Sequence, residues 1–387
     1  MLKYILIASA LLFTKLSDAQ SYDLLPVRID SLHWGYINTK GELTIKGPYD
    51  DAFFFYGERA RIKLNGRYGF IDKAGSLVIP ARYHVANDFS CELSLVDDSV
   101  HHEHFIDTKG DKAFGLPKGV DIAEPFINGF SKVLSQYYTY ETKIPKQHYK
   151  ISLMNTQGDI AFTLDADEVG DFDRGRAIII TDKKMGLIDT TGKFILMPTY
   201  DFIGTFCEGL ALVRKGKYFG YIDTAGKLAI KPKYTNASDF ASGLAPIALD
   251  TMWGYINHEG KIVIPRQYLW AESFSEGLAG VLVNSEGIGG GLKNKKWGMI
   301  DPTGYMKVRA IFEDYAPFSE GLAAVKYQQA WGYLDHDAVL KILPQYTLAG
   351  SFVNGITQVE DGVNTIYIDK TGRKIYSFRK HKKEHWW

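Results

Sequence analysis

Trp253-Gly254-Tyr255-Ile256-Asn257 is followed by the turn sequence His258-Glu259-Gly260 and by the run Lys261–Ile264, which Pro265 closes. Aromatic and β-branched residues are enriched in strands, so the first and last of these runs predict two β-strands. Asn at the start of a turn, with Gly three residues later in the left-handed conformation, is typical of a type I turn with a bulge. We therefore predict an antiparallel hairpin over residues 253–264.

The same aromatic-Gly-aromatic cluster recurs along the chain. Its clear copies begin at Trp34-Gly35, Trp253-Gly254, Trp297-Gly298 and Trp331-Gly332; looser copies centre on Gly69, Gly186 and Gly220, and degenerate copies on His104, Ser152 and Ile366. Six of the nine intervals between consecutive centres are 34 residues. All ten copies place Asp or Asn at the start of the following turn, and nine place Gly three residues later. Self-similarity at a fixed period indicates a tandem array, in which we expect these Trp and Gly residues to be structural.

A second motif, Phe-x-x-Gly-hydrophobic-Ala-x-Val, follows the hairpin, for example at Phe206–Val213. Its apolar and β-branched residues predict a third strand, which turns directly into the next aromatic-Gly strand. We thus expect ten units of about 34 residues, each with three antiparallel strands.

Two insertions, near residues 135–148 and 284–295, lengthen the same connection in two units. The step from the Phe motif to the next cluster centre is normally 14 residues, but it is 26 after Phe126 and 24 after Phe274. Both excess lengths, 12 and 10, are even, and an even insertion into a hairpin keeps its inward and outward faces. The insertions should project from one edge of the array. Their candidate contact residues are Tyr137, Tyr138, Tyr140, Lys143, Lys146, Lys293 and Lys295.

The combined pattern, Trp-Gly-Tyr-Ile-Asp-x-x-Gly-Lys followed by Ile-Pro, Tyr and Phe-Ser-Glu-Gly-Leu-Ala-x-Val, resembles the bacterial WG repeat, also called the KWG repeat. The resemblance covers roughly residues 24–378. The units centred on His104, Ser152 and Ile366 depart from it, because neither Trp nor Gly is kept there. The resemblance implies a β-rich repeat architecture and brings no active site with it.

We expect an all-β fold in which the ten units form an open, curved, β-solenoid-like array. Propeller blades usually need about 40–45 residues, and propellers commonly have about four to eight blades, which fits ten shorter units poorly. A β-propeller remains the alternative, because Leu24–Val27 resembles the third strand of a unit that begins midway. Such an offset is how ring propellers complete their closing blade.

The two ends of the chain differ from the array at residues 20–378. Residues 1–19 combine Lys3 with an apolar run over residues 4–13 and small residues before position 20, which predicts a signal peptide cleaved after Ala19. The expected location is therefore secreted or periplasmic, with no transmembrane segment. Residues 379–387 form a basic tail. Cys91 and Cys207 lie more than three units apart and are not expected to form a disulfide.

Lys+Arg and Asp+Glu each number 45, a balance that argues against nucleic acid as a partner. No arrangement of catalytic residues stands out, and we expect no metal and no cofactor. The leading hypothesis is a non-enzymatic, exported scaffold that binds a protein, a peptide or a cell-surface polymer. The alternative is a lectin-like carbohydrate-binding array, with the Trp rings as platforms, or an enzyme acting on glycans.

Overall fold

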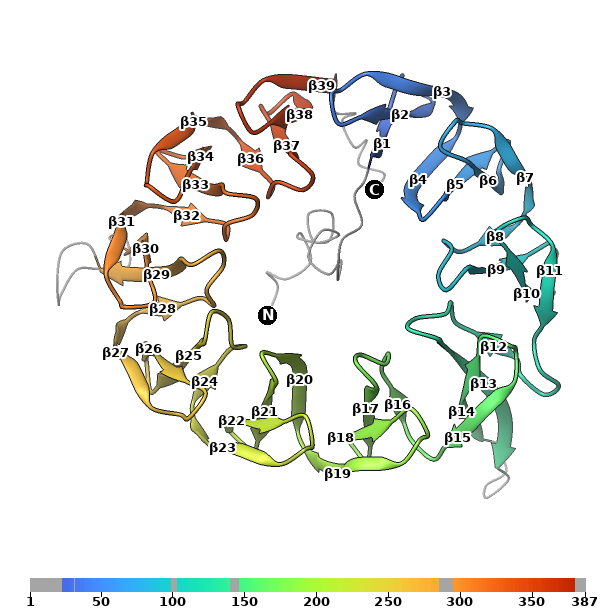
Figure 1. Cartoon of the computed structure of the whole chain (residues 1–387), viewed down its shortest axis with the longest axis horizontal. Coiled ribbons are helices and arrows are strands. Elements are labelled where there is room, and N and C mark those ends of the chain that lie inside the picture. The colour runs from blue at the N-terminus through green and yellow to red at the C-terminus, as the bar shows by residue number, and fades with distance from the viewer. Residues whose placement is uncertain (1–22, 31, 99–102, 140–145, 285–294, 380–387) are drawn as a thin grey trace.

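The computed structural model describes residues 23–379, apart from residue 31 and residues 99–102, 140–145 and 285–294. Within these residues the chain forms 39 strands in ten antiparallel sheets. The sheets are the blades of a closed ring in which blade 10 lies beside blade 1 (Figure 1). The protein is an all-β, ten-bladed propeller.

In blades 2 to 10 the chain passes from an inner strand to an outer strand on the rim, and the described part of blade 1 begins with its second strand (Figure 1). The inner strands of blades 2 to 10 are β4 (Asp51–Tyr56), β8 (Val85–Ala86), β12 (Ile122–Ala123), β16 (Glu168–Val169), β20 (Phe202–Cys207), β24 (Asn236–Ala237), β28 (Trp270–Ala271), β32 (Asp314–Tyr315) and β36 (Leu348–Ala349). The second strands of blades 1 to 10 are β1 (Leu24–Arg28), β5 (Arg59–Leu64), β9 (Leu93–Asp97), β13 (Phe130–Thr139), β17 (Arg176–Thr181), β21 (Leu210–Lys215), β25 (Leu244–Leu249), β29 (Ala279–Asn284), β33 (Ala323–Tyr327) and β37 (Ile356–Glu360).

The third and outer strands contain the hairpin that the sequence predicts. The third strands are β2 (Trp34–Asn38), β6 (Arg67–Ile71), β10 (Glu103–Asp107), β14 (Lys146–Asn155), β18 (Lys184–Asp189), β22 (Tyr218–Asp223), β26 (Met252–Asn257), β30 (Lys295–Ile300), β34 (Ala330–Leu334) and β38 (Asn364–Asp369). The outer strands are β3 (Leu43–Tyr49), β7 (Leu77–Tyr83), β11 (Lys112–Gly115), β15 (Ile160–Leu164), β19 (Phe194–Tyr200), β23 (Leu228–Tyr234), β27 (Ile262–Tyr268), β31 (Met306–Phe312), β35 (Leu340–Tyr346) and β39 (Lys374–Arg379).

Two expectations from the sequence are wrong, namely the open, curved, solenoid-like array and the three-stranded unit; the propeller alternative is correct. The fourth strand escapes notice because an inner strand such as Asn236–Ala237 is too short to show the alternation by which strands are recognised. Four strands fit into about 34 residues because the second and third strands are joined by tight turns, such as the two residues between Leu249 and Met252. Each unit of a repeat array is rotated by a small angle relative to the unit before it. Over ten units these rotations add up to a full circle, so the tenth blade lies beside the first.

Closure joins β39 of blade 10 to blade 1, and no described strand is exchanged between the two sheets. The hydroxyl of Tyr376 donates a hydrogen bond to the carbonyl oxygen of Arg28. A Cβ on Gly41 would lie 1.9 Å from Cγ2 of Ile375, so blade 1 approaches blade 10 closely at this glycine. Contacts between neighbouring sheets, rather than a shared sheet, therefore close the ring.

The Asp/Asn column at the hairpin turns has a structural role. In all ten units Oδ1 of this residue accepts hydrogen bonds from the backbone N–H groups two and four residues later. For Asp223 the donors are Ala225, at 3.0 Å, and Lys227, at 2.8 Å. Gly226 takes a φ of 75°, and Ala338 adopts a φ of 62° in the unit that lacks this Gly. The predicted turn is confirmed, and it accounts for the column.

The Gly of the aromatic-Gly-aromatic cluster is required because the outer strand crosses it. A Cβ on Gly254 would lie 2.5 Å from the carbonyl oxygen of Ile264. Approaches of 2.4 to 2.8 Å to the outer-strand backbone recur at Gly35, Gly69, Gly186, Gly220, Gly298 and Gly332. Where the Gly is replaced by His104, Ser152 or Ile366, the outer strand pairs directly with the central residue, and the register shift falls only after it, whereas at Gly35 a shift also falls before it. A side chain is tolerated there because the strand does not bulge over it.

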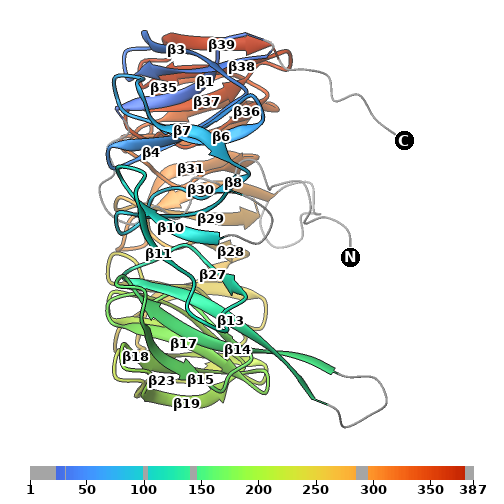
Figure 2. The same cartoon turned by 90° about the vertical axis from the view of Figure 1, so that its right-hand side faces the viewer.

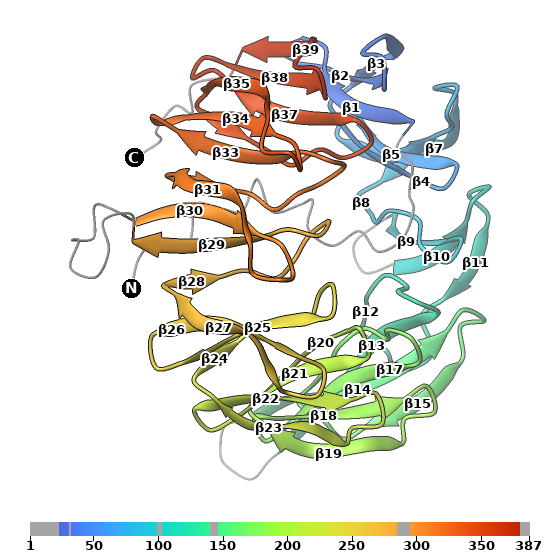
Figure 3. The same ribbon diagram turned by 60° about the vertical axis from the view of Figure 1, so that its left-hand side comes forward.

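Adjacent blades face each other around the ring (Figure 3). A set of contacts recurs between them. The Tyr221 hydroxyl donates to the carbonyl oxygen of Ser238 in the next blade, at 2.7 Å. The ring of Phe240, from the Phe motif of that blade, packs on Tyr221 with centroids 4.8 Å apart. The Glu208 carboxylate accepts the N–H of Gly243 in the next blade, at 3.0 Å. The motif residues thus recur because each holds one blade to the next.

Candidate binding site

The hairpin of blade 4 extends beyond the body of the ring. Its strands β13 and β14 have ten residues each and pair from Phe130 with Asn155 to Thr139 with Lys146. Figure 2 shows this hairpin projecting from one face of the ring. In blade 7 the corresponding strands end where Leu249 pairs with Met252. The equivalent pair in blade 4 is Ser135 with Lys150, so the extension begins at residue 136.

Three tyrosines are exposed on this extension. Tyr137, Tyr138 and Tyr149 are 47%, 48% and 44% exposed. Tyr149 pairs with Gln136, so it shares a face with Tyr138, and the Gln136 side-chain amide donates a hydrogen bond to the Tyr138 hydroxyl. Tyr137 lies on the opposite face. Sequence reasoning missed Tyr149, although its register opposite Gln136 follows from the even length of the insertion.

The other predicted contact residues are only partly brought together. Lys146 belongs to β14, and its backbone pairs with Thr139 across the hairpin. Lys295 is exposed at the start of β30, in blade 8, four blades from the hairpin. Tyr140, Lys143 and Lys293 lie outside the described residues. The structure therefore groups Tyr137, Tyr138 and Lys146 in one hairpin and separates Lys295 from them.

The Trp column packs into the seams between blades. Trp253 is 5% exposed within a core cluster, and Trp34, Trp297 and Trp331 are partly buried against such clusters. None of the four is an exposed ring in the structure. This favours the structural role over a carbohydrate platform.

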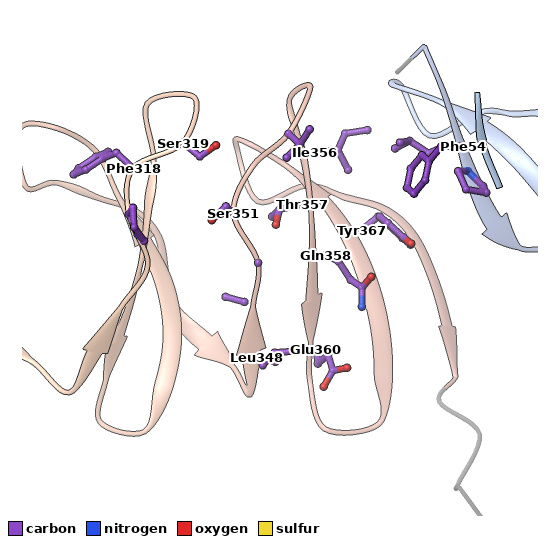
Figure 4. A pocket seen from close by; sticks show the side chains of 16 residues that line it. Phe54, Phe318, Ser319, Leu348, Ser351, Ile356, Thr357, Gln358, Glu360 and Tyr367 are labelled. Atoms are coloured by element: carbon purple, nitrogen blue, oxygen red, sulfur yellow. The ribbon is translucent and has the colours of Figure 1, made fainter. Parts of the chain in front are cut away.

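A cavity of about 440 Å³ lies where the ring closes (Figure 4). Blade 10 contributes Gln358 and Tyr367, blade 1 contributes Leu25 and Pro26, and blade 2 contributes Phe54. Sequence reasoning missed this site. No local signal could have found it, because residues 25 and 367 become neighbours only when the tenth blade meets the first.

In the described part of the chain no group of three or more His, Cys, Asp or Glu residues could hold a metal ion. Cys91 and Cys207 are both free thiols, as expected. Among the residues that the structure covers, no helix is long and apolar enough to cross a membrane.

Solved structures that resemble the ring differ widely from it in sequence. The extracellular domain of a hybrid two-component system from B. thetaiotaomicron is 10% identical; 94% of this chain and 63% of that chain align, with a TM-score of 0.30. BamB from Moraxella catarrhalis is 12% identical over 69% of this chain and 96% of its own, with a TM-score of 0.29. AztD from Citrobacter koseri is 12% identical over 76% and 93%, with a TM-score of 0.32. Likenesses at this level carry no information on what the ring binds.

No curated protein matches the sequence. The family description "WG containing repeat" matches residues 34–68, 68–97, 185–218, 219–250, 253–286, 297–328 and 331–362. These segments cover more than half of the chain, and each of them contains one of the seven cluster glycines. The resemblance seen in the sequence is therefore confirmed, and the chain belongs to the WG containing repeat family.

Proposed function

We propose that this protein is a non-enzymatic scaffold, exported from the cytoplasm, that binds a partner protein through the hairpin of blade 4. The observation that carries this proposal is the set of three exposed tyrosines, Tyr137, Tyr138 and Tyr149, on an extension that the ring does not need. Tyrosine is enriched at protein interfaces, because its ring buries a large area and its hydroxyl still finds a hydrogen bond. Loops on a rigid scaffold are also the usual site of recognition.

The ring does not need the extension because the same connection is short elsewhere. Leu249 and Met252 are joined by two residues, Asp250 and Thr251. Removing Gln136–Gln147 from blade 4 would leave His148 and Tyr149 as a two-residue turn between Ser135 and Lys150. The deletion therefore gives blade 4 the connection length of blade 7.

The test is a pull-down from the cell envelope with the mature chain and with the chain lacking Gln136–Gln147. We expect partners that the parent retains to be lost from the deletion variant and from Tyr137→Ser/Tyr138→Ser, while Tyr305→Ser retains them. Tyr305 is the matched control, because it is 65% exposed but lies outside the hairpin. An identical set of partners on parent and deletion variants, both folded by circular dichroism, would rule out the hairpin.

Export rests on residues 1–19, and its test is independent of binding. N-terminal sequencing of the protein recovered outside the cytoplasm should begin at Gln20. Recovery of the chain only from the cytoplasm, with Met1 intact, would contradict export.

A further inference from the structure

Among the residues that the structure describes, blade 1 has no counterpart of the strand that forms the inner edge of each other blade. Its described strands are β1, β2 and β3, and no described strand pairs with β1 on the inner side. In blade 7 the carbonyl oxygen of Pro246 accepts the N–H of Ser238, beside the inner strand, at 3.0 Å. Pro26 has the same place in β1, since both prolines pair with the Tyr that follows the cluster Gly. The carbonyl of Pro26 therefore faces the inner edge, and no described residue donates to it there.

A tyrosine hydroxyl in blade 10 marks the place that an inner strand of blade 1 would occupy. In four blades the Tyr after the central residue of the cluster donates to a backbone carbonyl 17 residues later, beside the inner strand of the next blade. These pairs are Tyr36 with Phe53, Tyr221 with Ser238, Tyr255 with Glu272 and Tyr333 with Gly350, at 2.7 to 2.8 Å.

Tyr367 has this position in blade 10, and the next blade is blade 1. Its hydroxyl has no hydrogen-bond partner among the described residues, and the residue lines the cavity of about 440 Å³. The four equivalent tyrosines are fully buried, whereas Tyr367 is partly exposed. The cavity thus lies where an inner strand of blade 1 would run. Tyr367 and Phe54 line it (Figure 4), and so does Pro26.

The other inner strands show which side chains fit such a place. Ala237, Ala271 and Ala349 pair with their second strands, and a Phe follows each of them three residues later. Each Phe packs on the Tyr of the preceding blade: the centroid distances are 4.8 Å for Phe240, 5.1 Å for Phe274 and 4.9 Å for Phe352. No described Phe has this place against Tyr367.

We propose that the inner edge of blade 1 binds an extended peptide of a partner protein, with a small residue followed three positions later by Phe. The peptide adds as the fourth strand of the blade. Its N–H donates to the carbonyl of Pro26, one of its carbonyls accepts from the Tyr367 hydroxyl, and its Phe packs on the Tyr367 ring. Addition of a strand to an open sheet edge is a recurrent mode of peptide recognition.

The chain's own upstream residues match this pattern poorly. In the register of blade 7, Leu24 corresponds to Leu244, so Ala237 corresponds to Ser17 and Phe240 to Gln20. Glutamine therefore stands where the other blades have Phe, and position 17 belongs to the expected signal peptide. This favours a partner as the source of the strand, and it deepens the proposed function at a second site, separate from the hairpin.

The test uses a labelled synthetic peptide with the sequence of residues 234–242, Tyr-Thr-Asn-Ala-Ser-Asp-Phe-Ala-Ser, and the mature full chain. We expect saturable binding by fluorescence anisotropy. A peptide with Ala in place of Phe should bind more than about tenfold more weakly, because a buried aromatic ring is lost. Tyr367→Phe should weaken binding about fivefold, the effect of one hydrogen bond.

Two control variants show whether binding depends on the inner edge of blade 1. Tyr221→Phe removes an equivalent hydroxyl whose acceptor, Ser238, does not line the cavity, and it should leave peptide affinity unchanged. The chain lacking Gln136–Gln147 should also bind the peptide like the parent, so the hairpin proposal can fail without affecting this one. Absence of saturable binding, or equal weakening by Tyr221→Phe, would overturn the proposal. Binding only after removal of residues 20–22 or 380–387 would assign the edge to the chain's own end and would also overturn it.

Discussion

The hydroxyl of Tyr333 in blade 9 donates a hydrogen bond to the carbonyl oxygen of Gly350 in blade 10, at 2.8 Å. The Tyr333 ring is fully buried, and burial raises the pKa of its hydroxyl above the ordinary value of 10.0. The hydroxyl therefore stays protonated and remains a donor throughout the neutral pH range. This bond is one of four of its kind, each of which joins one pair of neighbouring blades.

Removing this hydroxyl should destabilise the ring. Tyr333→Phe leaves the carbonyl of Gly350 without its donor, and we expect the free energy of unfolding to fall by about 1–2 kcal/mol. Urea denaturation followed by circular dichroism measures the change. Tyr305→Phe is the matched control, since Tyr305 is 65% exposed and its change should be near zero. Equal midpoints for the two variants would contradict a role for the bond.

The cluster Gly should not tolerate a methyl group. Gly254→Ala places Cβ 2.5 Å from the Ile264 carbonyl oxygen, so the outer strand must move, and we expect a loss of about 2–3 kcal/mol in unfolding free energy. Thermal denaturation checks this. Gly170→Ala is the control, because its Cβ would lie 3.7 Å from the nearest atom, an ordinary contact. A Gly254→Ala protein as stable as the Gly170→Ala protein would show that the close approach is not required.

The Asp residues of the Asp/Asn column at the hairpin turns should make the free energy of unfolding depend on pH. The Thr303 hydroxyl, and then the backbone N–H groups of Thr303 and Tyr305, donate to Asp301 and hold its pKa below the ordinary value of 3.8. A carboxyl whose pKa is lowered on folding adds stability that is complete above 3.8 and is lost as the pH falls through the folded-state value. The advantage of the parent over Asp301→Asn should therefore shrink between about pH 5 and about pH 2.

Urea midpoints of both proteins at several pH values measure this difference. Asn257 has the same place in another blade, so Asn257→Asp should introduce a pH dependence of the same sign. A parent advantage that grows on acidification would contradict the lowered pKa of Asp301.

The two thiols should react at different rates. Cys91 is exposed, whereas Cys207 is partly buried, and burial followed by the negative charge of Asp239 raises the pKa of its thiol. The thiolate is the reactive form, so iodoacetamide at about pH 8 should modify Cys91 first. Mass spectrometry of peptides over time measures both rates. Equal rates in the folded protein would contradict the difference, and the rates should converge in urea.

Much of each unit follows from residues close together in the chain. The hairpin predicted over residues 253–264 is present as β26 and the start of β27, because turn chemistry acts between Asn257 and its near neighbours. The inner strand was missed because two residues, Asn236 and Ala237, carry no periodic signal. The sequence predicts an insertion near residues 135–148, where β13 and β14 extend, but the exposed Tyr149 emerged only from the strand register.

The sequence alone determined the repeat, its turns and its glycines, because each depends on contacts within one unit or between neighbouring units. The repeated motif also identified the family. Ring closure is different in kind, because it depends on the accumulated rotation of ten blades, and a small change in each would leave the array open. Only the folded ring therefore brings Tyr367 of the last blade to Pro26 of the first. The cavity between them, and the Tyr367 hydroxyl that lines it and has no partner among the described residues, follow from that closure.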